Sequence, residues 1–190
     1  VAQEIYIDMI PVTDYITSGV WQIILNPTRV VEGQYDLWLP SENVLNRGTG
    51  FLYPDEEVTL TIPSTADKVI SVGAYDALTF SYASFSGRGY TWQDERTKPD
   101  LVASGVNVRT TAVGGGMTVV SGTSFATPFV TGASALLMEW GIVRGNDPFL
   151  YGEKVKAYLR RGARELPGFG KYPNREVGYG RLCLERSLPD

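Results

Sequence analysis

Histidine is absent from the 190 residues, and cysteine occurs once, at Cys183. A single cysteine cannot form a disulfide within the chain, and its neighbours Leu182 and Leu184 indicate a small buried apolar side chain. Histidine is the side chain that most often serves as a general base at neutral pH. Any acid–base chemistry carried out by these residues alone therefore has to use another residue type.

Long apolar runs are also missing. No run approaches the roughly 20 residues that span a bilayer, and the start lacks the basic and apolar regions of a signal peptide. We therefore expect no membrane span. The composition, 43% hydrophobic and 20% charged, is typical of a soluble globular chain rather than a disordered one. Because the first residue is valine, we expect this chain to be part of something longer.

Positive charge is scarce as well. The net charge is −4 and the sequence pI is about 5.0. The 17 basic residues are scattered, apart from a short cluster over 160–164. Nucleic-acid binding normally needs a basic face, so we expect no nucleic-acid partner.

Residues 5–67 have the pattern of antiparallel β-structure. Trp21, Ile23 and Leu25 alternate with other residues, residues 58–62 show a second alternating run, and turn signals separate the runs. This spacing is typical of sandwiches and jelly rolls. The aromatic side chains of the region fill the predicted core or, alternatively, form a carbohydrate- or partner-binding face. They are Trp21, Tyr35, Trp38, Phe51 and Tyr53.

From residue 68 the pattern changes to buried strands and helices, which predicts an α/β layer. Residues 69–74 and 98–103 read as strands. A helix is predicted over 124–140, because Ala126, Val130, Ala133 and Leu137 recur at offsets of four, three and four. Gly141 is its expected C-terminal stop. A second helix is predicted over 151–161.

The motif Gly-Thr-Ser-Phe-Ala-Thr-Pro at 122–128 lies where a glycine-rich approach meets the start of the first helix. A serine there, Ser124, points its oxygen away from the helix end, and the unpaired N–H groups of the first turn can bind developing negative charge. Gly122 permits close approach of a substrate backbone. Helix capping by Thr123 or Ser124 explains the same residues, so physics alone leaves both interpretations open.

The run 122–133 resembles the nucleophile signature of the subtilases, a family of serine proteases. Segments 69–76, 83–86, 98–103 and 178–182 follow in the family's order, so the resemblance covers about 68–187. It implies an endopeptidase that acts on peptide or protein substrates, with Ser124 as the nucleophile. It also implies that Gly122, Thr123 and Phe125 contact the substrate, Phe125 on the leaving-group side. Phe129 and Ser104 stand where the family usually has His and Pro, and neither position normally takes part in the reaction.

Segments 33–40 and 63–66 resemble the jelly-roll insert of clostridial spore-germination subtilases. This resemblance implies a β-rich, jelly-roll-like insert over 1–67 and the C-terminal part of a subtilase parallel-sheet domain over 68–190, an α/β fold overall. It further implies that the first half of the protein lies before Val1. We expect that half to be a partner, and the location to be extracellular or spore-associated.

By this resemblance the aspartate, the histidine and the oxyanion-binding asparagine lie outside the chain. Asp8 and Asp14 lack the flanking pattern of the family's aspartate. A dyad of Ser124 with Lys68 or Lys98, or a glutamate-based site, would restore a base. Otherwise the isolated chain is expected to be inactive. The alternatives are a pseudoprotease scaffold and a β-rich adhesin or carbohydrate-binding module.

No stretch has the oxygen-rich spacing of a calcium loop. We therefore predict no metal site and no cofactor in this chain, although structural calcium is common in the subtilases. A parallel sheet that lacks its first strands exposes an apolar edge, which a homo-oligomer would cover.

Overall fold

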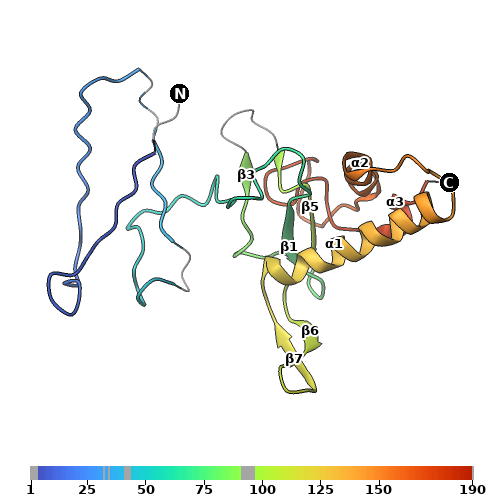
Figure 1. Cartoon of the computed structure of the whole chain (residues 1–190), viewed down its shortest axis with the longest axis horizontal. Helices are drawn as coiled ribbons and strands as arrows, with labels where there is room; N and C mark the ends of the chain where they lie inside the picture. The colour runs from blue at the N-terminus through green and yellow to red at the C-terminus, as the bar shows by residue number, and fades with distance from the viewer. Residues whose placement is uncertain (1–3, 32, 34, 41–43, 91–96, 190) are drawn as a thin grey trace. The chain divides into compact units, whose positions relative to one another are not determined.

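The computed structural model of the chain describes residues 4–31, 33, 35–40, 44–90 and 97–189, without the side chain of Tyr90 (Figure 1). The chain divides into two units, Val1–Gly50 and Phe51–Asp190, and each is described by itself. The predicted division into 1–67 and 68–190 stays a prediction.

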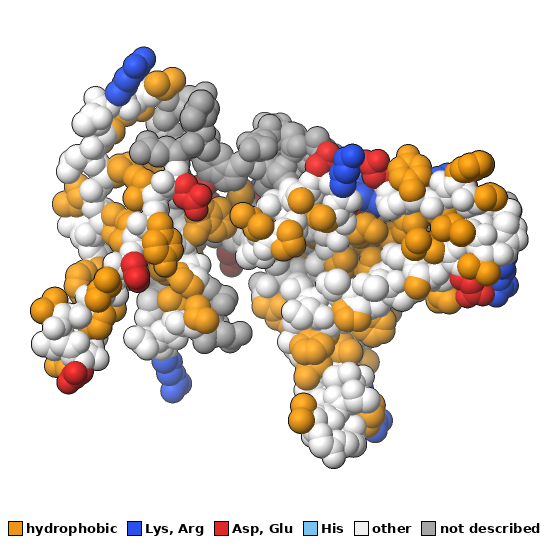
Figure 2. Space-filling model, viewed as in Figure 1, with side chains coloured by type: hydrophobic (Ala, Val, Ile, Leu, Met, Phe, Trp, Pro, Cys, Tyr) orange, Lys and Arg blue, Asp and Glu red, His pale blue; other side chains and the backbone are white. Residues whose placement is uncertain are grey.

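The described residues of the first unit form no β-ladder and no α-helix. The strand predicted around Trp21–Leu25 is therefore not formed, and the run 58–62 in the second unit is not a strand either. A strand needs a neighbour for its backbone hydrogen bonds. In the run 58–62 the N–H of Thr59 donates to the carbonyl oxygen of Arg88 at 2.9 Å, but no ladder continues from this contact. The five aromatics expected in the core are each at least 40% exposed, which corrects that expectation. Figure 2 shows many hydrophobic side chains on the visible surface.

The sheet of the second unit has the order β2-β1-β5. Strands β1 (Val72–Asp76) and β5 (Leu101–Ser104) are parallel, and β2 (Ser81–Tyr82) is antiparallel to β1. On the other edge of β5, Val102 forms a parallel bridge with Arg181. The strands predicted around 69–74 and 98–103 are therefore confirmed, and the predicted closing segment 178–182 pairs with the sheet.

Two short hairpins flank the sheet. Strands β3 (Gly89–Tyr90) and β4 (Thr97–Lys98) pair, as do β6 (Val108–Thr111) and β7 (Met117–Val120). The second hairpin projects away from the sheet, and its strand β7 leads directly to the start of helix α1 (Figure 1).

Helix α1 (Thr123–Met138) packs on β1 and β5 and confirms the predicted helix. It buries the four predicted residues Ala126, Val130, Ala133 and Leu137. Its apolar side chains pack in the core beside Leu101 and Ala103 of the sheet. By length and composition alone, Thr123–Val143 is also long and apolar enough to cross a membrane, which is weak evidence for a single helix.

The expectation that Gly141 ends this helix is wrong. A π-helical turn, η2 (Glu139–Val143), continues α1 through Gly141. A Cβ at Gly141 would lie 2.8 Å from Cδ2 of Leu150 and 3.1 Å from the carbonyl oxygen of Asp147. Position 141 is therefore occupied by glycine because a larger side chain would overlap with these neighbouring atoms. The chain leaves the helix near Gly145, which has a φ of +76°.

Helix α2 (Gly152–Gly162) confirms the second predicted helix, and the short helix α3 (Leu184–Ser187) packs against it. The backbones of the two helices are in direct contact at Gly162, because a Cβ there would lie 2.4 Å from the amide nitrogen of Ser187. Together α1, α2 and the sheet enclose one main apolar core. The predicted α/β class, with parallel and antiparallel strands, is confirmed.

Candidate active site at the start of α1

Ser124 is the second residue of α1, and it is exposed. The helix start is fixed by Gly122, whose φ of +152° is a conformation that favours glycine. The N–H of Gly122 donates to the carbonyl oxygen of Gly105 at 2.8 Å. A Cβ at Gly105 would lie 2.6 Å from Cβ of Ala74, so this glycine lets the helix start sit directly against β1. The sheet therefore holds the backbone beneath Ser124 in place.

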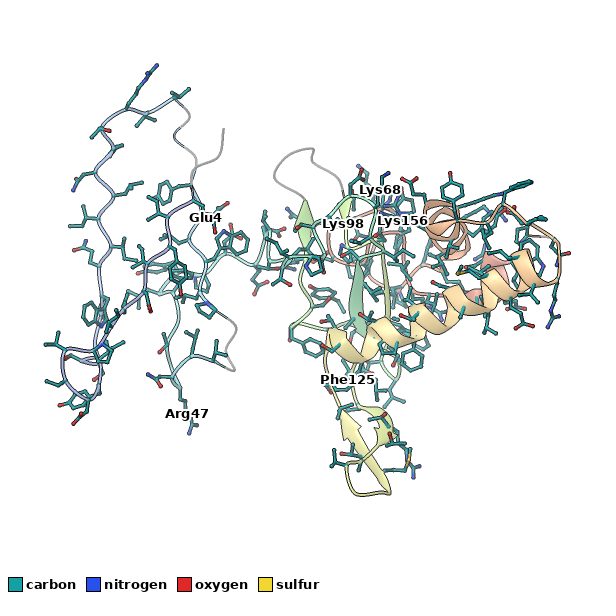
Figure 3. The ribbon with its side chains drawn as sticks, viewed as in Figure 1. Glu4, Arg47, Lys68, Lys98, Phe125 and Lys156 are labelled. Atoms are coloured by element: carbon teal, nitrogen blue, oxygen red, sulfur yellow. The ribbon has the colours of Figure 1, made fainter. Side chains whose placement is uncertain are left out.

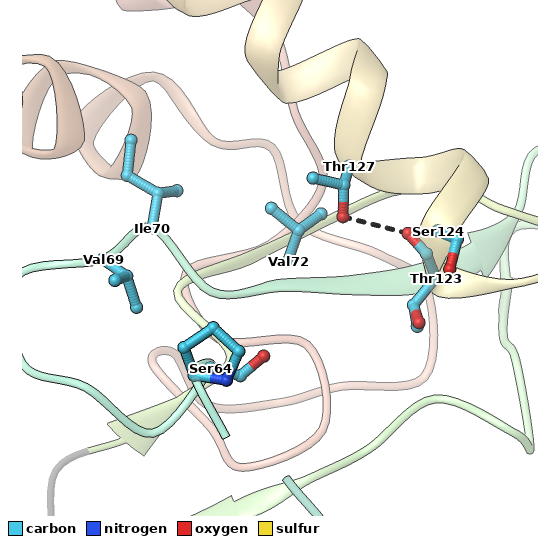
Figure 4. A pocket seen from close by; sticks show the side chains of 8 residues that line it. Ser64, Val69, Ile70, Val72, Thr123, Ser124 and Thr127 are labelled. Atoms are coloured by element: carbon cyan, nitrogen blue, oxygen red, sulfur yellow. Dashed lines mark hydrogen bonds between the residues drawn. The ribbon is translucent and has the colours of Figure 1, made fainter. Parts of the chain in front are cut away.

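A hollow of about 270 Å³ lies beside Ser124 (Figure 4). One wall is the first turn of α1, with Thr123, Ser124 and Thr127. The facing wall consists of residues from the approach to β1 and from β1 itself. These residues are Pro63, Ser64, Val69, Ile70 and Val72. The nucleophile candidate therefore lines a partly apolar hollow.

Of the three residues predicted to contact the substrate, one lines the hollow and two do not. Thr123 lines the hollow, and its carbonyl oxygen accepts a hydrogen bond from the Thr127 hydroxyl at 3.0 Å (Figure 4). Gly122 and Phe125 do not line it. The half-buried Phe125 ring instead covers Gly122, since a Cβ added there would lie 3.4 Å from a ring carbon. Phe125 thus lies at the N-terminus of α1 (Figure 3).

Within the described residues, no carboxylate, amine or guanidinium lines the hollow of Ser124. Lys98, a candidate base, is 1% exposed, and its Nζ donates to the carbonyl oxygen of Val69 and to the carboxylate of Asp100. Lys68 lines a different hollow, which Lys98 also borders. Neither lysine is therefore placed to deprotonate Ser124.

Metal-binding side chains do not gather anywhere in the part of the chain that the structure describes. No group of three or more Cys, Asp or Glu residues is arranged to hold an ion there. The acidic residues Asp8 and Asp14 belong to the first unit, where both are exposed.

The fold and the helix-start serine are those of a subtilisin-like domain. Residues 52–180 match the Subtilase family, and the chain belongs to that family.

Proteases of this family are similar to the chain in sequence and in structure. The Clostridium perfringens CspB protease is 50% identical, with a TM-score of 0.72 over 75% of this chain and 30% of that one. The mouse membrane-bound transcription factor site-1 protease is 39% identical over 68% of this chain and 12% of its own length. The Bacillus subtilis serine protease AprX is 33% identical over 72% of this chain and 33% of its own length. The chain thus spans a third or less of these relatives.

Sequence reasoning missed the wall of the hollow that faces Ser124. The sequence predicts Pro63 and Ser64 only as part of the β-rich insert, and in the structure both residues border the hollow. Local pattern carries no signal for this contact, because it joins segments about 60 residues apart. The apolar residues Val69, Ile70 and Val72 were recognised only as strand residues.

Proposed function

We propose that this chain carries the nucleophile of a subtilisin-like serine endopeptidase and that Ser124 is that nucleophile. The observation that supports the proposal best is the exposed serine at the start of a helix whose inner face is buried against the sheet, within a Gly-Thr-Ser sequence, in a chain of the subtilase family. Gly122 brings the backbone close to the reacting position, and Thr123 lines the adjoining hollow.

In this proposal the Ser124 hydroxyl oxygen attacks the carbonyl carbon of the scissile peptide bond while a general base takes its proton. The C–N bond then breaks, the amine leaves with that proton, and water hydrolyses the ester on Ser124. The negative charge on the carbonyl oxygen develops near the N-terminus of α1. The first N–H groups of a helix lack intrahelical acceptors and stabilise such charge.

The general base is proposed to come from a part of the protein outside these 190 residues. The chain has no histidine, and the described side chains around the hollow offer no other base. The remainder of the same protein is therefore the proposed partner, and the isolated chain is proposed to be inactive. A site that lacks its base retains only about 10³- to 10⁴-fold catalysis over water.

Phe125 is proposed to shape the preference for the substrate residue on the leaving-group side. Its ring covers Gly122 and is half-exposed to solvent, so a substrate side chain passing the helix start can contact it. Exchange for alanine should change the preference at that substrate position and leave the chemistry intact. Cleavage of a peptide library by the whole protein and by its F125A variant would measure the change.

The central test is covalent labelling with a fluorophosphonate, read by intact mass, on this chain and on the whole protein. We expect one label on Ser124 in the whole protein and none on the isolated chain. S124A should abolish labelling. S84A is the matched control, because Ser84 is also exposed and lies outside the hollow.

Two outcomes would contradict the proposal. A whole protein that is folded but never labelled would favour the pseudoprotease scaffold. Labelling of the isolated chain would show that a base exists within it, and the Lys68 and Lys98 variants would then be tested. An extracellular or spore-associated location, the lack of a metal or cofactor in this chain, and homo-oligomer formation stay predictions.

A further inference from the structure

The carboxylate of Asp100 is the centre of a buried charge cluster whose lysines contact the backbone of Val69, a residue that also lines the hollow of Ser124. Asp100 is fully buried. Its Oδ2 accepts from the N–H of Ser71 at 2.6 Å and from Nζ of Lys98 at 3.2 Å. Its Oδ1 accepts from Nε of Arg160 at 2.9 Å and lies 3.3 Å from Nζ of Lys156. One carboxylate is therefore shared by three cations.

The two lysines of this cluster are held by backbone oxygens as well. Nζ of Lys98 donates to the carbonyl oxygen of Val69 at 3.1 Å. Nζ of Lys156 donates to the carbonyl oxygens of Val69 and Asp67, both at 2.9 Å. Burial lowers the pKa of Lys156, and the charges of Lys98 and Arg160 lower it further, while Asp100 opposes the shift. The positive charges thus repel one another inside a poorly solvated region.

A second hollow, of about 340 Å³, opens over these cations. Four cationic side chains line it: Lys68, Lys98, Lys156 and Arg160. Two carboxylates, Asp67 and Glu153, line it too, and Glu153 is exposed. Figure 3 shows Lys68, Lys98 and Lys156 labelled close together, away from Phe125 and the start of α1. The hollow is therefore separate from the proposed active site and carries an excess of positive charge.

We propose that this second hollow binds a small oxyanion of the phosphate type. The carboxylate of Asp100 lies buried behind the lining and already faces three cations, so an entering anion would relieve their repulsion. Guanidinium and ammonium groups are the usual protein ligands of phosphate. The ring of Tyr179 lies 4.9 Å from the guanidinium carbon of Arg160 and fixes its plane.

Charged residues of the hollow allow a test in which two exchanges should change the affinity for an anion in opposite directions. Lys68 is exposed on the rim, so K68Q removes a positive charge with little effect on the fold. Asp67 and Glu153 are both exposed carboxylates of the hollow, and E153Q removes one of these repulsive charges. An anion should bind K68Q about fivefold more weakly and E153Q about fivefold more tightly, the factor that corresponds to about 1 kcal/mol per exposed charge pair. K171Q is the matched control, because Lys171 is exposed and lies outside the hollow.

The experiment is a calorimetric titration of the full chain with inorganic phosphate at constant ionic strength, with acetate and calcium chloride as separate titrants. We expect one saturable phosphate site and a melting temperature that rises with phosphate, because a ligand that binds the folded state stabilises it. Urea midpoints that match the unchanged chain would show that K68Q and E153Q fold.

Three results would overturn the proposal. The first is no saturable phosphate binding by folded protein. The second is tighter binding of acetate than of phosphate, which would assign the site to a carboxylate. The third is binding of calcium that E153Q weakens, which would assign the carbonyl oxygens of Asp67 and Val69 to a cation.

Discussion

Nε of Arg160 donates to Oδ1 of Asp100 at 2.9 Å, and this contact ties α2 to the residue that precedes β5. The same carboxylate accepts the N–H of Ser71 at 2.6 Å, close to the start of β1. Three segments from different parts of the second unit therefore meet at one buried side chain. The two parallel strands that support α1 depend on this junction.

We predict that D100N lowers the free energy of unfolding by about 3–5 kcal/mol. The exchange leaves three buried or half-buried cations without their shared carboxylate, and an uncompensated buried charge is costly. Urea denaturation of the chain measures the effect. E185Q is the control, because Glu185 pairs with Arg164 at the surface and its loss should cost less than about 1 kcal/mol. Equal effects of the two exchanges would contradict the prediction.

The second prediction concerns the contribution of Asp147 to the stability of the fold as the pH falls. Nζ of Lys154 donates to its carboxylate at 2.7 Å, the hydroxyl of Tyr158 donates at 2.9 Å, and these contacts lower the pKa of Asp147 below its usual 3.8. The contribution to stability is therefore present above pH 3.8 and is lost as the pH falls through the lower, folded-state pKa. We expect D147N to be less stable than the unchanged chain at pH 6, and the difference to shrink in acid. Urea midpoints across that range measure it, and a constant difference would contradict the assignment.

The elements of the second unit could be predicted from sequence because their signals are local. The spacing of Ala126, Val130, Ala133 and Leu137 predicted α1 to within a few residues, and the apolar runs predicted β1 and β5. The Gly-Thr-Ser sequence predicted a serine at the helix start, and the structure places Ser124 there, exposed. Its role as the nucleophile stays a prediction.

Features that depend on distant segments could not be predicted. The alternation around Trp21 predicted a strand, but a strand forms only where another backbone pairs with it. Gly141 looked like a helix stop because glycine often is one, whereas its actual reason is the contact with Leu150. The cluster around Asp100 joins residues from 71 to 160, and only the fold reveals that they meet.

The third prediction compares two helical glycines, one closely packed and one with open space around it. G141A should lower the free energy of unfolding by about 1–3 kcal/mol, because the added methyl would overlap with Leu150 in a packed region. Gly132 also lies in a helix, α1, but a Cβ there would meet nothing within 4 Å. G132A should therefore stabilise the chain by up to about 1 kcal/mol. Thermal or urea unfolding would compare the two, and a stabilising G141A would contradict the packing argument.

The last prediction joins backbone conformation to the proposed reactivity of Ser124. G122A should slow fluorophosphonate labelling of the whole protein by about tenfold or more, because a side chain at a φ of +152° is strained by about 1–3 kcal/mol and displaces the helix start. G132A, further along α1, serves as the control and should label at the unchanged rate. Retained labelling in G122A would mean that the backbone conformation of Gly122, with a φ of +152°, does not position the serine. Loss of labelling in a G122A protein that unfolds at the same urea concentration as the parent would separate positioning from stability.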